Sequence, residues 1–157
     1  MKTKRILGGL LLIGIILAWM AMIYRFSAQT ATQSADLSRS IALYILHRLG
    51  IQLSGETFTR YHAFIRKCAH FSIYLGLGIW SYLFMRVCSV YFPRLTAACL
   101  CVGFAAADEY HQLSVLGRGG QWSDVGIDSM GALMGILLAA LLWNILQRIF
   151  HAMARKR

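Results

Sequence analysis

The stretch VGIDSMGALMGILLAALLWNIL, from Val125 to Leu146, holds one charged residue, Asp128, in 22 positions. An apolar run of about 20 residues lets a helix cross the roughly 30 Å hydrocarbon core of a bilayer. The whole chain has a matching composition: 58% of its 157 residues are hydrophobic, 14% are charged and the mean hydropathy is +0.57. Soluble domains are about 45–50% apolar and about 25% charged. We therefore expect an integral membrane protein, not a soluble enzyme or a disordered chain.

Working outward from 125–146, we expect three further spans, at 6–24, 68–85 and 93–112, in a single domain over residues 1–157. The first follows basic residues but exceeds the apolar core of a signal peptide, about 7–15 residues, and no small-residue cleavage site follows, so it is interpreted as an uncleaved anchor. The third has only 13 apolar residues, Leu95–Ala107, which is too short to cross. It therefore has to continue through the polar stretch 108–112, partly below the membrane surface.

Small residues mark one face of the last span. Gly131 and Gly135 are four residues apart, with Ala132 and Ala139 nearby. Such a face lets two helices approach closely within a membrane, so we expect it to pack against another span.

The distribution of basic residues predicts the orientation. With four spans, segments 1–5, 86–94 and 148–157 share one side and carry nine Lys and Arg in 24 residues, whereas 25–68 and 113–124 carry seven in 56. Cytoplasmic segments are enriched in Lys and Arg, so both termini are expected inside a bacterial cell membrane and all six acids toward the outer face. The net charge of +10 is explained by the excess of Lys and Arg in the predicted cytoplasmic segments. No nucleic-acid partner is therefore expected.

The first outer segment is expected to hold an amphipathic helix. Ser34 can cap a helix over Ala35–Leu49 that Gly50 ends. Its apolar residues form one stripe, which predicts a helix on the outer leaflet or over the bundle: Leu37, Ile41, Tyr44, Ile45 and Leu49. A second helix is expected to run from Thr57 into the second span. The predicted fold class is thus an all-α membrane protein with four transmembrane helices and one interfacial helix.

The four cysteines, at positions 68, 88, 99 and 101, lie in or beside apolar stretches. This placement does not indicate a secreted disulfide framework. We interpret Cys99 and Cys101 as packing residues.

Polar groups from several segments are expected to meet at the outer face and to form a ligand-binding site. The candidate residues are Arg66, Lys67, His70, Asp108, Glu109, His111, Gln112, Arg118, Asp124 and Asp128. Helical spacing places Arg66, His70 and Tyr74 on one face, and Asp124 and Asp128 on another. Because carboxylates near the apolar boundary are costly unpaired, arginines are expected to partner them. Arg25, Glu56, Arg60 and His62 are instead interpreted as ordinary interfacial charges.

The motifs resemble those of the VanZ family of bacterial membrane proteins. The resemblance rests on Phe26-Ser27-Ala28-Gln29, Arg66-Lys67-x-x-His70-Phe71-x-x-Tyr74-x-x-Leu77-Gly78, Asp108-Glu109-x-His111-Gln112, and Gly117-Arg118 followed by Asp124, Asp128, Gly131 and Gly135. It implies a role in tolerance to teicoplanin, a lipoglycopeptide that binds peptidoglycan precursors, and a shared polar site at these residues. The founding members tend to carry Asn where Asp128 stands, so the chain is similar to another branch of the family.

Three functions remain open from the residues. The first is an envelope protein that binds a lipid-linked or peptidoglycan precursor through basic side chains, without catalysis. The second is an acid–base or metal-assisted enzyme acting on a lipid head group or peptide. The third is a proton or ion path. No HExxH motif is present, and Glu109 and His111 lie about 200° apart on an ideal helix. We therefore expect no metal or other cofactor, and the oligomeric state stays open.

Overall fold

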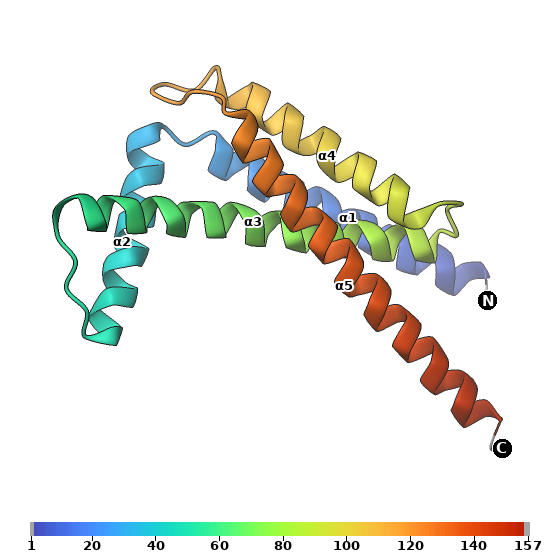
Figure 1. The fold of residues 1–157 in the computed structure, drawn as a ribbon. Coiled ribbons are helices and arrows are strands. Elements are labelled where there is room, and N and C mark those ends of the chain that lie inside the picture. Colours follow the sequence, from blue (N-terminus) through green and yellow to red (C-terminus); the bar gives the residue numbers. More distant parts are fainter. Residues whose placement is uncertain (1, 156–157) are drawn as a thin grey trace.

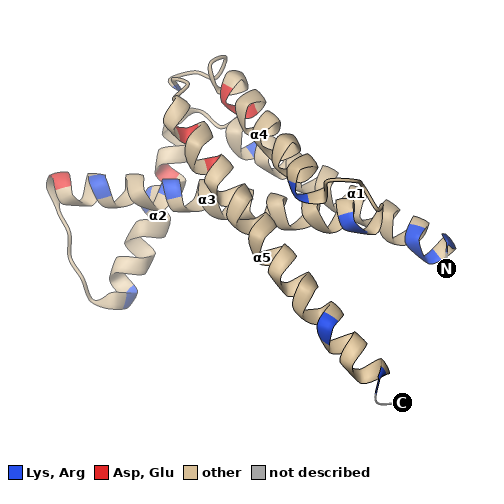
Figure 2. Ribbon diagram, turned by 45° about the vertical axis from the view of Figure 1, so that its right-hand side comes forward, with Lys and Arg blue, Asp and Glu red and all other residues tan. Residues whose placement is uncertain are grey.

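The computed structural model of the protein describes residues 2–155, which form five helices and no strands. The helices are α1 (Lys2–Ser27), α2 (Ala31–Leu49), α3 (Gly55–Val87), α4 (Pro93–Gln112) and α5 (Trp122–Ala154). Figure 1 shows that α1, α3, α4 and α5 alternate in direction, while α2 crosses the end of the bundle where α3 begins. The C-terminal half of α5 diverges from the other helices (Figures 1 and 2). The all-helical prediction is confirmed.

Three of the described helices are long and apolar enough to cross a membrane: α1, α3 and α5. They contain the predicted spans 6–24, 68–85 and 125–146. Helix α4 has the predicted bounds of 93–112 and is long enough, but it does not meet the same standard of apolar composition. The polar residues at its C-terminal end are the physical reason, so a fourth span stays a prediction.

Glycines bring α3 and α5 into backbone contact. A Cβ atom added to Gly131 would collide with the carbonyl oxygen of Phe71, and one added to Gly135 would collide with that of Leu75. From the opposite helix, Gly78 faces the carbonyl oxygen of Ala132 in the same way. We call Gly78, Gly131 and Gly135 the glycine seam. The predicted small-residue packing face is confirmed, and α3 is its partner.

Helix α1 packs on α3 through an aromatic side chain. The Trp19 ring occupies the space that a Cβ on Gly76 would need, and its Nε1 donates a hydrogen bond of 2.9 Å to the carbonyl oxygen of Ile73. The same packing buries a core that spans four helices: Ile16, Ile23, Tyr74, Leu77, Cys101, Ala105 and Ala132. Cys101 is therefore a packing residue, as predicted. Cys99 was also predicted to be a packing residue, but its side chain is exposed. All four cysteines are free thiols.

The opposite end of the bundle has its own tether. Arg5 donates hydrogen bonds to the carbonyl oxygen of Val87, at 3.2 Å, and to the hydroxyl oxygen of Ser89, at 2.5 Å. The start of α1 is thereby held to the turn between α3 and α4.

Helix α2 differs from its prediction at one end. Gly50 ends the helix in the left-handed conformation, with φ of 67°, as predicted. The predicted start is wrong: Thr30, not Ser34, caps the helix, because the Thr30 side chain accepts from the Gln33 backbone N–H and the Gln33 side chain accepts from the Thr30 N–H. Such a reciprocal capping box satisfies two donors, which a lone Ser34 does not. Ser34 therefore lies in the second turn.

The buried face of α2 consists of Ser38, Ala42 and Leu46. Most of the predicted apolar stripe is exposed instead, including Leu37, Ile41, Tyr44 and Leu49. The stripe therefore does not pack tightly against the bundle, and its contact with the outer leaflet stays a prediction. Helix α3 runs without a break from Gly55 into the second span, as expected, and its first turns pack beside α2.

Candidate functional site

A cavity of about 260 Å³ lies at the end of the bundle where α2, α3, the loop 113–121 and the start of α5 meet. We call it the polar pocket. Its polar lining residues are Ser38, His62, Arg66, Lys67, His70, Gln112, Arg118, Gln121, Asp124 and Asp128. The acidic residues gather at this end of the molecule, over the end of α4 and the starts of α3 and α5 (Figure 2). The pocket thus contains seven of the ten candidate residues.

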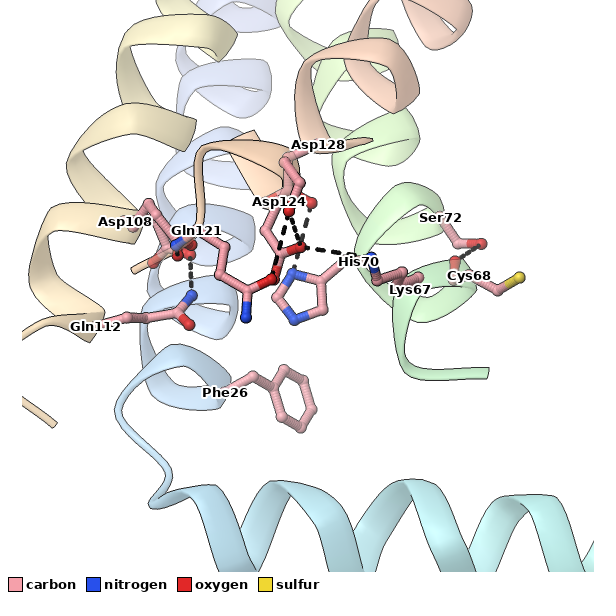
Figure 3. Close-up of polar contacts among 12 residues, drawn as sticks. Phe26, Lys67, Cys68, His70, Ser72, Asp108, Gln112, Gln121, Asp124 and Asp128 are labelled. Carbon is pink, nitrogen blue, oxygen red and sulfur yellow. Dashed lines mark hydrogen bonds and ion pairs between the residues drawn. The ribbon is translucent and has the colours of Figure 1, made fainter. Parts of the chain in front are cut away.

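Asp128 forms a buried contact with His70 across the α3–α5 packing face. The Asp128 side chain is 2% exposed, and its Oδ1 lies 3.4 Å from His70 Nδ1. Figure 3 shows the imidazole directed from α3 toward the first turns of α5. Both residues line the polar pocket, and the carboxylate is placed to orient the imidazole.

Lys67 and Asp124 form a second, looser pair. The Lys67 Nζ lies 4.0 Å from Asp124 Oδ1, and the Lys67 side chain is half exposed. Exposed pairs of this kind contribute about 0–1 kcal/mol. The pair sets the local charge of the pocket rim more than it stabilises the fold.

Gln112 links an acid to an arginine. Its Nε2 donates to Asp108 Oδ2 at 3.4 Å, and its Oε1 accepts from Arg118 NH1 at 2.8 Å. Arg118 NH2 also donates to the carbonyl oxygen of Phe26 at 3.4 Å. The loop that carries Arg118 is therefore tied to the ends of both α1 and α4.

The predicted pairing of arginines with carboxylates is wrong. Within residues 2–155, Arg66 makes no ion pair or side-chain hydrogen bond, and Arg118 bonds only to an amide and a backbone carbonyl. The acids on α5 are instead approached by Lys67 and His70, because those residues lie on the part of α3 that the glycine seam holds against α5. Two guanidinium groups thus border the pocket without a carboxylate partner.

The electrostatic environment of Arg118 reflects this arrangement. Burial lowers the pKa of the Arg118 guanidinium, and the positive charge of Arg66 lowers it further, against the opposing effect of the nearby acids. In addition, Arg118 Nε is buried with no hydrogen-bond partner among the described residues. The pocket therefore has a region where an anion would be favoured.

Three candidate residues lie outside the pocket. Glu109 accepts a short hydrogen bond from the backbone N–H of Gln121, which holds the end of the loop to α4. His111 stacks on Tyr24, with ring centroids 4.5 Å apart and planes 16° apart. Asp108 does not line the polar pocket and borders a separate cavity. Glu109 and His111 therefore face different neighbours.

Asp108 borders a second, small cavity of about 30 Å³ together with Ser27 and Tyr74. All three side chains are at most 4% exposed. Their oxygens Asp108 Oδ1, Ser27 Oγ and Tyr74 Oη have no hydrogen-bond partner among residues 2–155. A cavity of this size accommodates about one water molecule.

Three pocket residues were absent from the predicted set. His62, interpreted from the sequence as an interfacial charge, lies four residues before Arg66, so the helical spacing that grouped Arg66 with His70 was a usable signal. No signal in the sequence marked Ser38 or Gln121. The ordinary interpretation holds for Glu56 and Arg60, which form an exposed ion pair at 2.7 Å.

The His, Cys, Asp and Glu side chains that could bind a metal ion do not cluster in the described structure. Among residues 2–155, no group of three or more His, Cys, Asp and Glu side chains is placed to hold a metal ion. The chemistry that the pocket residues themselves offer is anion binding by Arg66 and Arg118 and proton exchange by His70 and Asp128.

Helices apolar enough to cross a membrane, with a polar pocket at one end, define a helical membrane protein. The model of the family VanZ/LLP1 matches residues 12–144, so the chain belongs to the VanZ family, which is linked to glycopeptide resistance. This confirms the resemblance drawn from the motifs. The chain matches no curated protein and no solved structure.

Proposed function

We propose that this protein binds a lipid-linked or peptidoglycan precursor in the polar pocket, at the outer face of the cell membrane. A precursor bound by the protein would be less accessible to antibiotics that bind it. The protein would thereby alter sensitivity to glycopeptide and lipoglycopeptide antibiotics such as teicoplanin. Membership of the VanZ family supports the link to glycopeptide resistance. The outer-face location is supported by the lower density of Lys and Arg in segments 25–68 and 113–124.

The observation that carries the proposal is the pair of arginines without carboxylate partners. Arg66 and Arg118 both border the polar pocket, while the acids of α5 lie nearer to Lys67 and His70. Both guanidinium groups are partly buried and Arg118 Nε has no hydrogen-bond partner among residues 2–155, so an anionic ligand would stabilise this arrangement. Guanidinium groups bind phosphate and carboxylate in a bidentate manner, and cell-wall precursors carry both groups.

Replacing arginine by lysine tests the proposal, because it keeps the positive charge but removes the planar guanidinium group with its paired N–H donors. Hydrogen bonds to charged groups contribute about 1.5–3 kcal/mol. Arg118→Lys and Arg66→Lys should therefore each weaken binding of lipid II by about 10- to 100-fold, measured with purified protein in nanodiscs. Teicoplanin tolerance in a sensitive host should fall in parallel.

Arg60→Lys is the matched control, because Arg60 lies on the same helix in an exposed pair with Glu56, outside the pocket. It should bind lipid II like the parent. If both pocket variants also bind like the parent, the arginines do not hold the ligand and the proposal is wrong.

The contact between His70 and Asp128 favours a second candidate, an enzyme that uses this pair for acid–base catalysis on a lipid head group or peptide. Their 3.4 Å separation allows the carboxylate to orient the imidazole. An enzyme would convert lipid II to a new product on incubation, and His70→Gln would abolish that turnover while leaving binding intact. A binding protein would return the precursor unchanged.

A further inference from the structure

A further cavity, of about 190 Å³, lies between α2, the end of α1 and the first half of α3. We call it the apolar slot. Its apolar lining residues are Phe26, Leu37, Ile41, Ile65, Ala69 and Ile73. The slot therefore has the surface chemistry of a hydrocarbon-binding site and differs sharply from the polar pocket.

The two cavities are adjacent. Ser38, Arg66, His70 and Arg118 border both of them. The boundary between the polar pocket and the apolar slot thus runs along the same two arginines that lack a carboxylate partner. An anionic group bound to these arginines has its next atoms at the entrance of the slot.

The α2 side of the slot is not closed by protein packing. Leu37 and Ile41 are 45% and 42% exposed, although both are large and apolar. Helix α2 uses a different face, at Ser38, Ala42 and Leu46, to pack against the bundle. The apolar residues of α2 at the slot are therefore free to contact a ligand chain that continues outward.

We propose that the apolar slot holds the first segment of the hydrocarbon chain of a long-chain alcohol phosphate, whose phosphate binds Arg66 and Arg118. This inference rests on the proposed function and narrows it: the ligand is the lipid-linked form of a precursor, not its soluble peptide or sugar portion. A phosphate attached directly to a chain matches the geometry, because no polar cavity separates the arginines from the slot along their shared border.

A series of probes that differ only in chain length tests the inference. Purified protein in amphipol is titrated with inorganic phosphate and with butyl, hexyl and octyl phosphate. Each fully buried methylene is expected to tighten binding by about fourfold. Affinity should therefore rise along the series in the parent protein.

Two variants should remove this dependence by filling the slot. Ile41→Trp and Ala69→Trp enlarge residues that line the slot and not the polar pocket. Both should bind inorganic phosphate like the parent and should bind octyl phosphate no more tightly than butyl phosphate. Leu43→Trp, on the exposed side of α2 and outside the slot, is the matched control and should keep the full chain-length dependence.

The outcomes separate the inference from the proposed function. If inorganic phosphate binds but chain length has no effect in the parent, or if the effect survives in both slot variants, the chain lies elsewhere and the inference is wrong while the proposed function stands. If neither phosphate nor any alkyl phosphate binds, the proposed function fails as well. Should the tryptophan variants not fold, an octyl phosphate with a diazirine at the chain end must label residues of the slot in the parent protein, and labelling elsewhere overturns the inference.

Discussion

Asp128 is almost completely inaccessible to solvent, yet the ionisable side chain that lies within 4 Å of it among residues 2–155 is a histidine rather than an arginine. Sequence spacing identified Asp128 as a pocket residue but favoured an arginine partner, since arginine is the usual bidentate partner of a carboxylate. The partner depends on which side chain lies across the helix interface, and this depends on the relative rotation and register of α3 and α5. Neither quantity is encoded in the local spacing of either helix.

The contact with His70 predicts the result of Asp128→Asn. Asn has the same shape and lacks the charge that is costly to bury, so folding should be unaffected. If the arginines supply the ligand contacts, precursor affinity should change by less than about threefold, in contrast to the loss of 10-fold or more expected for Arg118→Lys. Isothermal titration with lipid II in nanodiscs provides the comparison. Loss of binding in Asp128→Asn with normal binding in Arg118→Lys would instead make the carboxylate the ligand or the catalyst.

At the scale of elements, the glycine seam is the structural basis of the α3–α5 interface. Sequence alone identified Gly131 and Gly135 as a packing face but did not indicate which helix they contact, because small-residue faces are common in membrane spans. Helix bounds were predicted well where the apolar pattern or a glycine cap was strong, as at Gly50. The start of α2 was misplaced because Thr30 and Ser34 are both suitable caps, and only the position of Gln33 distinguishes them.

Adding one methyl group to the seam should separate α3 from α5. Gly135→Ala places a Cβ against the backbone of α3, where no side chain can move aside. Overpacking of this kind costs about 1–3 kcal/mol. The thermal unfolding midpoint of the detergent-purified protein should therefore fall by several degrees.

Gly103→Ala is the control for this substitution. Gly103 lies in α4, where an added Cβ meets nothing within 4 Å. Since glycine is unfavourable in a helix by about 0.5–1 kcal/mol relative to alanine, this variant should be equally or slightly more stable than the parent. A Gly135→Ala protein as stable as Gly103→Ala would show that the seam is not close-packed.

For the whole molecule, the acids mark one end of the bundle, and the polar pocket lies there (Figure 2). The composition was sufficient to predict an all-helical membrane protein, and the motifs were sufficient to predict its family. The apolar slot was not foreseen, because its walls come from three helices; the stripe on α2 marked Leu37 and Ile41 as an apolar face, but not the residues of α1 and α3 that they would meet.

The predicted orientation can be measured by cysteine labelling. In a background without Cys68, Cys88 and Cys99, which are exposed, Ser114→Cys should react with a membrane-impermeant maleimide in intact cells, because the loop 113–121 is predicted to lie outside. Met153→Cys, near the end of α5, should react only after permeabilisation. The opposite pattern would place the polar pocket in the cytoplasm and remove its access to outer-leaflet precursors.

The glycine seam also fixes the relative positions of His70 and Asp128. Gly131 contacts the backbone of Phe71, the neighbour of His70, and lies one turn after Asp128, so the spacing of these two side chains is set by rigid backbone contact. Arg118, by contrast, lies in the loop 113–121, which hydrogen bonds from side chains and from the backbone hold to the neighbouring helices. One side of the polar pocket is thus positioned by backbone packing between helices, and the other by hydrogen bonds to a loop. For the precursor proposed as ligand, we expect the side formed by α3 and α5 to discriminate by charge position and the loop side to accommodate head groups of different size.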